Sequence, residues 1–142
     1  MILSDQTIME LINNRAMSIE PFREDRLTPN GYDFSIVDTV VLPPNGGLQL
    51  ESLETVSLPA YVGAIMLLRS TYTRKGVFGS FGFVDAGFRG KIRFFVKNLG
   101  EEQVEIVKDK GVFQMIFINL DKAAAKTYEL RSGHYQNQGI KS

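Results

Sequence analysis

The sequence predicts an all-β protein with a short helix at its N-terminus. Short apolar segments recur along the chain, turn-forming Pro, Gly and Asn residues separate them, and helical spacing of apolar residues is clear in one place only. Many short strands divided by close turns are typical of a sandwich, a jelly roll or a barrel rather than of a parallel α/β sheet. The chain has 142 residues and no linker-like segment divides it, so we expect a single domain over residues 1–142.

The predicted N-terminal helix begins after Ser4, a residue type that caps helices well, and Asp5 suits the positive end of the helix dipole. Apolar residues then fall on one face at helical spacing, at Ile8, Leu11 and Ile12. The adjacent asparagines at 13–14 predict the end of this helix. A second short helix is expected at Asp121–Lys126, where alanines are frequent.

Short apolar patterns and the turn residues between them predict a series of strands. They are expected at Phe34–Leu42, Leu48–Leu50, Thr55–Leu58, Tyr61–Leu68, Ile92–Val96, Gln103–Val107 and Val112–Asn119. Turns are expected at residues 43–47, where the sequence reads PPNGG, and at residues 98–100.

The composition argues against several classes of function. Sixteen basic and sixteen acidic residues cancel, so no overall field attracts nucleic acid or a membrane surface. With no cysteine and one histidine, the sequence has neither a disulfide framework nor the ligands of a typical zinc cluster. No apolar run approaches the roughly 20 residues of a membrane span, and acids occur too early in MILSDQTIMEL for a secretory signal. We therefore expect a soluble, cytoplasmic protein.

The first candidate site is LLRSTYTRKGV, residues 67–77, where an apolar strand runs into basic and hydroxyl residues. Guanidinium and hydroxyl groups donate hydrogen bonds to phosphate oxygens, and the N–H groups of a loop add to the field. The segment supplies such donors at Arg69, Ser70, Thr71 and Arg74. A solvated turn has the same composition, and for the loop by itself the solvated turn is the simpler interpretation.

Two further polar residues stand out. Asp33, in PNGYDF, either caps a turn through its own backbone or contributes to a hydrated Mg²⁺ site, which needs one or two carboxylates besides phosphate oxygens and water. Gln114, in KGVFQMIFINL, is the one amide early in an apolar strand, and a buried amide needs a fixed hydrogen-bond partner. That partner is either another protein group or a ligand. A turn cap is the ordinary explanation for Asp33, and a partner within the protein is the ordinary explanation for Gln114.

The stretch FVDAGFRGKIRFFVKN, residues 83–98, holds one carboxylate, Asp85. We expect Phe83, Val84 and Phe88 to surround this carboxylate with apolar groups. Burying a charge in this way is costly unless the charge serves a partner or a reaction. Asp85 is therefore a candidate catalytic base.

Taken in order along the chain, these segments resemble one family, the dUTPases and dCTP deaminases, which share a distorted jelly-roll fold and usually form homotrimers. PNGYDF resembles the first motif of that family, RSTYTRKG the second, FGFVDAGFRGKI the third and KGVFQMIF the fourth. MILSDQTI with the following SIEPF, and the tail segment YQNQG, resemble the deaminase branch. The resemblance spans nearly the whole chain and implies a C-terminal arm, at about residues 128–142, that closes the active site.

The resemblance implies a role for each matching residue. Asp85 is expected to orient and deprotonate the attacking water, Phe88 to pack on the deoxyribose, and Asp33 to contact the metal through water. The expected triphosphate contacts are Arg69, Ser70, Thr71, Arg74 and Gln114. The expected readers of the uracil edge are the backbone groups of Gly79, Ser80, Phe81 and Gly82. The arm residues expected to close over the nucleotide are Tyr135 and Gln138.

One position departs from the deaminase branch. That branch carries a glutamate on the strand after the third motif, where it shuttles protons to the cytosine amine, and an ungapped count from Asp85 places Phe95 there. A phenyl ring cannot transfer protons, and loss of such a group typically costs about 10²–10⁴-fold in rate. We therefore predict a Mg²⁺-dependent dUTP diphosphatase that forms dUMP and pyrophosphate. The alternatives are a dCTP deaminase, a bifunctional dCTP deaminase/dUTPase, a catalytically silent nucleotide-binding relative and a purely structural jelly roll.

Overall fold

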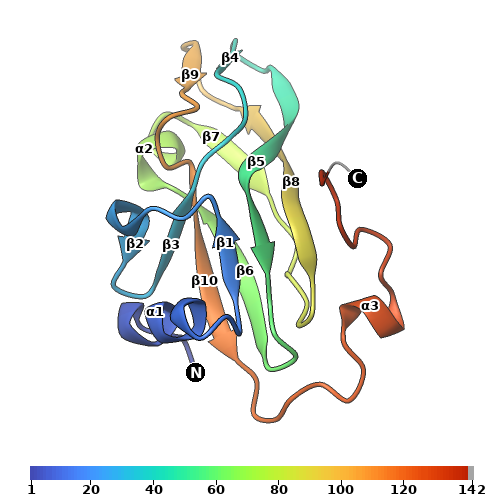
Figure 1. Ribbon diagram of the computed structural model, residues 1–142. Coiled ribbons are helices and arrows are strands. Elements are labelled where there is room, and N and C mark those ends of the chain that lie inside the picture. The colour runs from blue at the N-terminus through green and yellow to red at the C-terminus, as the bar shows by residue number, and fades with distance from the viewer. Residues whose placement is uncertain (141–142) are drawn as a thin grey trace.

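The computed structural model describes residues 1–140, and it is built mainly of antiparallel strands (Figure 1). One four-stranded sheet has the order β1-β5-β8-β7 and consists of β1 Ser18–Glu20, β5 Gly47–Ser57, β8 Arg89–Asn98 and β7 Val77–Ser80. A second has the order β2-β3-β10-β6 and consists of β2 Leu27–Thr28, β3 Gly31–Phe34, β10 Phe113–Asn119 and β6 Val62–Leu68. A two-stranded ribbon is formed by β4 Val40–Leu42 and β9 Val104–Ile106. The helical elements are α1 Asp5–Asn13, the 3₁₀ helix η1 Glu24–Arg26, α2 Ser70–Thr73 and α3 Tyr128–Arg131.

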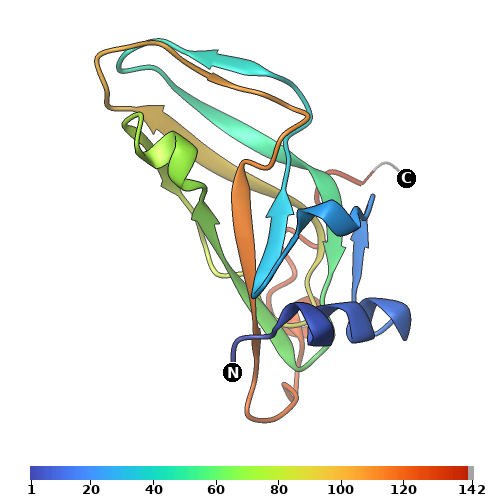
Figure 2. The same cartoon turned by 90° about the vertical axis from the view of Figure 1, so that its left-hand side faces the viewer.

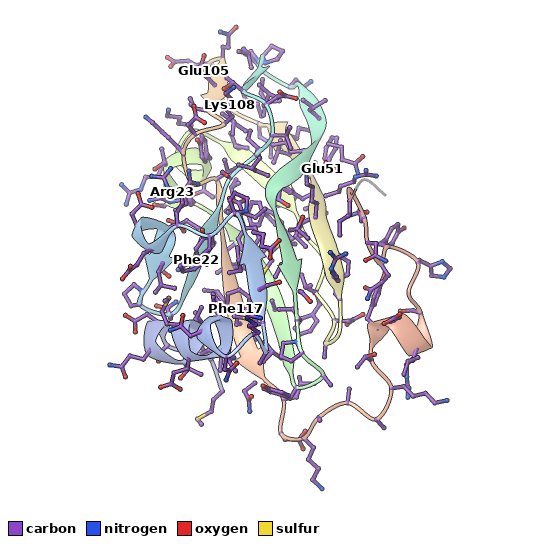
Figure 3. All side chains as sticks on the ribbon, in the orientation of Figure 1. Phe22, Arg23, Glu51, Glu105, Lys108 and Phe117 are labelled. Atoms are coloured by element: carbon purple, nitrogen blue, oxygen red, sulfur yellow. The ribbon has the colours of Figure 1, made fainter. Side chains whose placement is uncertain are left out.

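Aromatic rings join the two larger sheets, which Figure 2 shows from the side with the β4–β9 ribbon at one end. The ring centroid of Phe113 in β10 lies 4.8 Å from that of Phe94 in β8 and 5.3 Å from that of Phe34 in β3. Phe81, which follows β7, stacks on Phe94 at 5.0 Å. Side chains fill the interior, where Phe117 is fully buried (Figure 3). Burying one such ring stabilises the fold by roughly 1.5–3 kcal/mol, so these rings contribute much of the cohesion between the sheets.

The mostly β architecture with a short N-terminal helix is confirmed, and the sheets of the described residues do not close into a barrel. Ser4 caps α1 as expected: its Oγ accepts a hydrogen bond from the N–H of Thr7 at 3.4 Å. No helix within residues 1–140 has the length and apolar content needed to cross a bilayer.

The helix expected at Asp121–Lys126 is wrong, and the short helix α3 forms later instead. The N–H of Leu120 donates to the carbonyl of Tyr61, and the N–H of Ala124 donates to the carbonyl of Ala60, both at 2.8 Å. These backbone groups are therefore tied to the loop between β5 and β6. Alanine content alone could not show this, because tertiary contacts override helix propensity.

Most of the expected strands are present with different bounds. The segments expected at Leu48–Leu50 and Thr55–Leu58 belong to one strand, β5, whose pairing with β8 is irregular between residues 51 and 55. The strand expected at Phe34–Leu42 is interrupted, since β3 ends at Phe34 and β4 begins at Val40. The other four expected strands correspond to β6, β8, β9 and β10. β1, β2 and β7 were not expected, because two to four residues carry little periodicity.

Beyond β10 the chain crosses to the edge of β8, and α3 and the tail lie on that side of the molecule (Figure 1). Gln138 forms a parallel bridge with Gly90, and the N–H of Lys91 donates to the carbonyl of Gln138 at 2.7 Å. The tail is therefore docked on β8 through its backbone. The last two residues of the expected arm, Lys141 and Ser142, lie outside the described residues.

Candidate active site

Asp85 lies at a corner whose two sides are fixed by backbone hydrogen bonds. Before it, Val84 exchanges two such bonds with Ala64 of β6, at 2.8 and 2.9 Å. After it, the N–H of Phe88 donates to the carbonyl of Asp85 at 3.1 Å and closes a turn in which Gly87 has a φ of 86°. The backbone therefore sets the position of Asp85 from both directions.

The side chain of Asp85 is exposed, so the expectation that apolar groups surround it is wrong. Val84 and Phe88 are buried, whereas Phe83 lies over Gly63 and remains 54% exposed. The reason is the turn itself, which places its first residue at the surface while the flanking apolar residues point inward. Within residues 1–140 no ion pair or side-chain hydrogen bond engages the carboxylate of Asp85, which leaves it available to a water or a ligand.

A cavity of about 520 Å³, called here the Asp85 cavity, opens beside this carboxylate. It brings together five of the expected site residues, namely Gly82, Asp85, Phe88, Tyr135 and Gln138. Phe88 forms one wall, packed edge to face against Tyr128 with ring centroids 5.5 Å apart. An apolar wall, a carboxylate and polar groups from the tail suit a small ligand with a hydrophobic ring and a charged end.

The Asp85 cavity is also lined by polar residues that were not predicted for the site from the sequence, among them Gln49, Arg93 and His134. Gln49 lies on β5 opposite Phe95 of β8, and Arg93 lies on β8 opposite Glu51. Only the pairing register of β5 with β8 brings Gln49 to the cavity, and no local pattern in the sequence reports that register. For His134 there was a signal, since it adjoins Tyr135 in the expected arm.

On the edge of β8 that faces away from β5, Arg93 has no strand partner among the described residues, and this edge faces the Asp85 cavity. On this side of β8, β7 pairs with Phe95–Asn98, and Gln138 binds both backbone groups of Lys91, at 2.7 and 2.8 Å. The N–H of Ile92 points the other way, to the Oγ of Ser52 in β5. Because backbone groups alternate in direction along a strand, the N–H and C=O of Arg93 point to the cavity side. They offer a ligand one donor and one acceptor.

A second cavity of about 330 Å³, called here the Arg69 cavity, lies near the end of β6 where α2 begins. It is lined by Thr28, Asp33, Leu67, Leu68, Arg69, Ser70 and Gln114. The expected residues Asp33, Arg69, Ser70 and Gln114 are thus brought together. The amide nitrogen of Gln114 donates to the Oγ1 of Thr28, which supplies the protein partner expected for this amide.

Asp33 and Arg69 form an ion pair in the Arg69 cavity, with Asp33 Oδ2 3.5 Å from Arg69 Nη1. Burial raises the pKa of Asp33 above its usual range, and the positive charges of Arg69 and Arg26 oppose this shift without cancelling it. Gly111 permits the close approach, because an added Cβ would lie 2.9 Å from the Cβ of Asp33 and 3.1 Å from Arg69 Nη1. The cavity therefore combines one carboxylate with a cluster of donors suited to an anion.

Several expected site residues lie outside both cavities. Thr71 is exposed and lines neither, and Arg74 lines a different surface cavity beside Glu101 and Glu102. Of the four residues expected to read uracil, only Gly82 reaches the Asp85 cavity. Gly79 and Ser80 pair with β8, and the ring of Phe81 packs into the core against Phe94.

The two cavities share no lining residue and lie apart along β6. Val84, next to Asp85, pairs with Ala64, and Arg69 follows five residues later. At about 3.3 Å per residue along a strand, this separation is roughly 17 Å. Asp85 and Arg69 of one chain therefore face separate cavities.

Comparison with known proteins assigns the chain to a family. The family described as dCTP deaminase-like matches residues 34–120, which is more than half of the chain. A dCTP deaminase from Pyrococcus horikoshii is 35% identical over 133 residues, covering 83% of each protein. This chain belongs to the dCTP deaminase-like family. A relative from Aquifex aeolicus named "dCTP deaminase, dUMP-forming" is 28% identical over 166 residues, covering 97% of this chain and 91% of that protein.

Solved structures support the fold of this family member. A dCTP deaminase from Agrobacterium tumefaciens aligns with a TM-score of 0.69 and 16% identity, covering 82% of this chain and 47% of the other. A mutant dUTPase of Staphylococcus bacteriophage 80alpha, solved with dUpNHpp, aligns with a TM-score of 0.60 and 18% identity, covering 78% of this chain and 94% of the other. Both branches of the resemblance thus share this fold.

Position 95 is the one at which the resemblance to the deaminase branch leads us to expect a glutamate. Phe95 occupies it, on the outer face of β8, where it is 45% exposed and does not line the Asp85 cavity. Its ring covers Gly47 of β5, where an added Cβ would lie 2.5 Å from the ring. Asp85 is consequently the one carboxylate among the described residues that line the cavity.

Proposed function

We propose that this member of the dCTP deaminase-like family is a dUTP diphosphatase, which hydrolyses dUTP to dUMP and pyrophosphate. The observation that carries the proposal is that the Asp85 cavity contains a single carboxylate among its described lining residues. Asp85 is its one carboxylate among the described residues and has no ion-pair partner there, and Phe95 supplies no second acid. Hydrolysis needs a base for one water, whereas deamination also needs proton transfer to the departing amine.

In the proposed reaction, the base and sugar of dUTP occupy the Asp85 cavity. Phe88 provides a wall for the deoxyribose, and the edge of β8 at Arg93 offers a backbone donor and acceptor to the base. Asp85 accepts a proton from a water as the water oxygen attacks the α-phosphorus. The bond from the α-phosphorus to its bridging oxygen breaks, and that oxygen leaves with pyrophosphate.

The triphosphate would be held by the Arg69 cavity of a second copy, which makes the proposed enzyme an oligomer, and by family resemblance a homotrimer. The separation of the two cavities supports this, because neither is complete for a nucleotide within one chain.

Magnesium fits the Arg69 cavity as a phosphate-bound ion. No group of three or more acidic or histidine residues within residues 1–140 could hold a metal by itself, and Asp33 is the one described carboxylate in this lining. Mg²⁺ commonly uses one or two carboxylates together with phosphate oxygens and water. Asp33 would contact it through water, and the bound ion would supply neutralisation of the triphosphate charge.

A second candidate function is dCTP deamination, alone or coupled to dUTP hydrolysis. The names of the sequence relatives favour it more directly than they favour a diphosphatase. Glu51 of β5 lies on the same outer face as Phe95, but its carboxylate is paired with Arg93 Nε at 2.7 Å and with Lys91 Nζ at 3.9 Å. A carboxylate committed to two cations is not free to shuttle protons, so the geometry supports hydrolysis better.

One experiment separates these functions. Purified protein is incubated with Mg²⁺ and separately with dUTP, dCTP or dTTP, and pyrophosphate and ammonia are measured in the same samples. We expect pyrophosphate from dUTP and no ammonia from dCTP. Ammonia from dCTP would establish deamination, and the absence of both products with every nucleotide would refute both functions.

The role of Asp85 is tested by Asp85→Asn, which keeps the size and polarity of the side chain and removes the base. Turnover of dUTP should fall by about 10²–10⁴-fold, while dUTP binding is largely retained. The melting temperature should not change, because the exposed side chain makes no hydrogen bond or ion pair within residues 1–140. Asp38→Asn, at an exposed position outside both cavities, is the matched control. Undiminished turnover in Asp85→Asn would remove Asp85 from the mechanism.

A further inference from the structure

We infer that Arg93 determines the base specificity of the site, by donating hydrogen bonds to the oxygen at C4 of uracil. This inference rests on the proposed function and names the residue that would separate dUTP from dCTP. Arg93 projects from the outer face of β8 and lines the Asp85 cavity. Its own backbone groups face the same cavity at the free edge of β8, so one residue presents both a backbone acceptor and a charged donor to the base.

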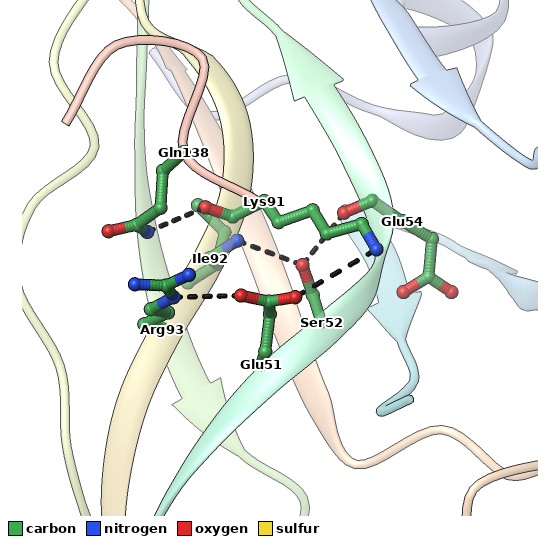
Figure 4. A network of polar contacts seen from close by, with 7 residues as sticks. All are labelled: Glu51, Ser52, Glu54, Lys91, Ile92, Arg93 and Gln138. Atoms are coloured by element: carbon green, nitrogen blue, oxygen red, sulfur yellow. Dashed lines mark hydrogen bonds and ion pairs between the residues drawn. The ribbon is translucent and has the colours of Figure 1, made fainter. Parts of the chain in front are cut away.

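The guanidinium of Arg93 is held in a fixed orientation by Glu51. Arg93 Nε donates to Glu51 Oε2 at 2.7 Å, and Figure 4 shows Arg93 and Lys91 on either side of this carboxylate. Because the bond uses Nε, the two terminal Nη groups remain available as donors. The guanidinium is planar, so fixing Nε also fixes the direction of the Nη groups.

A second layer of contacts supports Glu51. Its Oε1 lies 3.9 Å from Lys91 Nζ, and the backbone of Lys91 is bound on the other side by Gln138 of the tail. The side chain of Glu51 is only 28% exposed, whereas that of Arg93 is 47% exposed. The carboxylate is thus the anchored partner, and Glu51 is a positioning residue for Arg93.

Base chemistry explains why such an arrangement discriminates. Uracil presents an acceptor at C4 and a donor at N3, which match the donor-only guanidinium and the carbonyl of Arg93. Cytosine presents an amino donor at C4 and an acceptor at N3, so its amine would face a group that cannot accept a hydrogen bond. A site built around one hydrogen-bonding pattern disfavours the opposite pattern, because a donor then faces a donor and an acceptor faces an acceptor. Gln49, the other side chain on this wall, carries both a donor and an acceptor and does not discriminate.

The test compares Arg93→Met with Lys97→Met in the full chain. Lys97 lies on the same face of β8 but lines neither the Asp85 cavity nor the Arg69 cavity, so its substitution controls for loss of a positive charge. The ratio of kcat/KM for dUTP to that for dCTP, measured by pyrophosphate release, should fall about 10- to 100-fold in Arg93→Met. It should stay unchanged in Lys97→Met. An unchanged ratio in Arg93→Met would overturn the inference and leave the proposed function standing.

Glu51→Gln tests the positioning role separately. A merely structural defect would lower kcat/KM for both nucleotides equally, whereas loss of the guanidinium orientation should lower the dUTP-to-dCTP ratio. Arg93→Lys keeps the positive charge but lacks the two fixed Nη donors of the guanidinium. Compared with Arg93→Met, we expect it to recover less than half of the decrease in the dUTP-to-dCTP ratio of kcat/KM.

Binding of dUMP and dCMP, measured by calorimetry on the same variants, gives a readout that does not depend on turnover. A preference of the unsubstituted protein for dUMP that Arg93→Met abolishes would support the inference even if no diphosphatase activity were found. Equal binding of dUMP and dCMP by the unsubstituted protein would overturn it.

Discussion

Gly87 holds the turn that positions Asp85, and alanine at this position should destabilise the fold. A φ of 86° costs an alanine about 1–2 kcal/mol. The added Cβ would also lie 2.4 Å from the Cβ of Thr127, well inside van der Waals contact. Relieving an overlap of this kind costs roughly 1–3 kcal/mol. We therefore expect Gly87→Ala to lower the free energy of unfolding by about 2–5 kcal/mol.

Urea unfolding followed by circular dichroism measures this change, and thermal unfolding gives a second estimate. For a chain of this size about 1 kcal/mol corresponds to roughly 3–4 °C in Tm, so a decrease of at least about 6 °C is expected. Gly82→Ala, on the other side of Asp85, is the control, because nothing lies within 4 Å of its added Cβ. If the two variants unfolded at the same urea concentration, the argument that Gly87 fixes the turn would be refuted.

Two further predictions concern the carboxylate of Glu54 and the tail. Burial raises the pKa of Glu54 above its ordinary 4.5, against the hydrogen bonds that Ser35 donates to it. A raised folded-state pKa means that the native state binds the proton more tightly, so the protein should lose stability as pH rises from about 4.5 through that raised value. The glutamine in Glu54→Gln cannot ionise, so this variant should not show the loss when its free energy of unfolding is measured in urea from pH 4 to 8. If the free energy of unfolding changed with pH in the same way in the variant and in the unsubstituted protein, the raised pKa of Glu54 would be contradicted. Gln138→Ala removes the 2.8 Å hydrogen bond to the carbonyl of Lys91 and should raise the KM for dUTP about 5-fold with little change in kcat, and an unchanged KM would show that this contact does not help to form the site.

The sequence predicted correctly the elements that are set by interactions between residues close together in the chain. The cap at Ser4 and the apolar spacing of α1 are set within one or two turns of helix, and both are present. By contrast, β5 was divided because Ser52 and Glu54 interrupt its apolar alternation. In the structure both are buried, at 0% and 2% exposure, and are satisfied by partners more than fifteen residues away. No single-segment pattern reports such partners.

The candidate site divides in the same way. Asp85 and Phe88 were predicted because they belong to one continuous motif, and the structure places both in one cavity. Arg69 and its neighbours were expected to bind the same nucleotide as Asp85, but the two groups are separated along β6. A motif carries no information on whether its partner motif lies in the same chain. Gln49 was missed, since only the register of β5 against β8 brings it to the cavity.

That register links the buried polar residues of β5 to the specificity proposed for Arg93. Ser52 accepts a hydrogen bond from the N–H of Ile92 at 2.8 Å and donates to the carbonyl of Glu54 at 2.7 Å, which closes the irregular segment between residues 51 and 55 (Figure 4). A slip of one residue would turn every side chain of the strand to the opposite face, and the carboxylate of Glu51 would no longer lie across from Arg93. The buried apolar residues of β5 oppose such a slip, and the buried hydroxyl of Ser52 with its two fixed partners opposes it as well. The polar residues inside β5, which interrupt an apolar strand, therefore help to keep Glu51 across from Arg93 on the outer face.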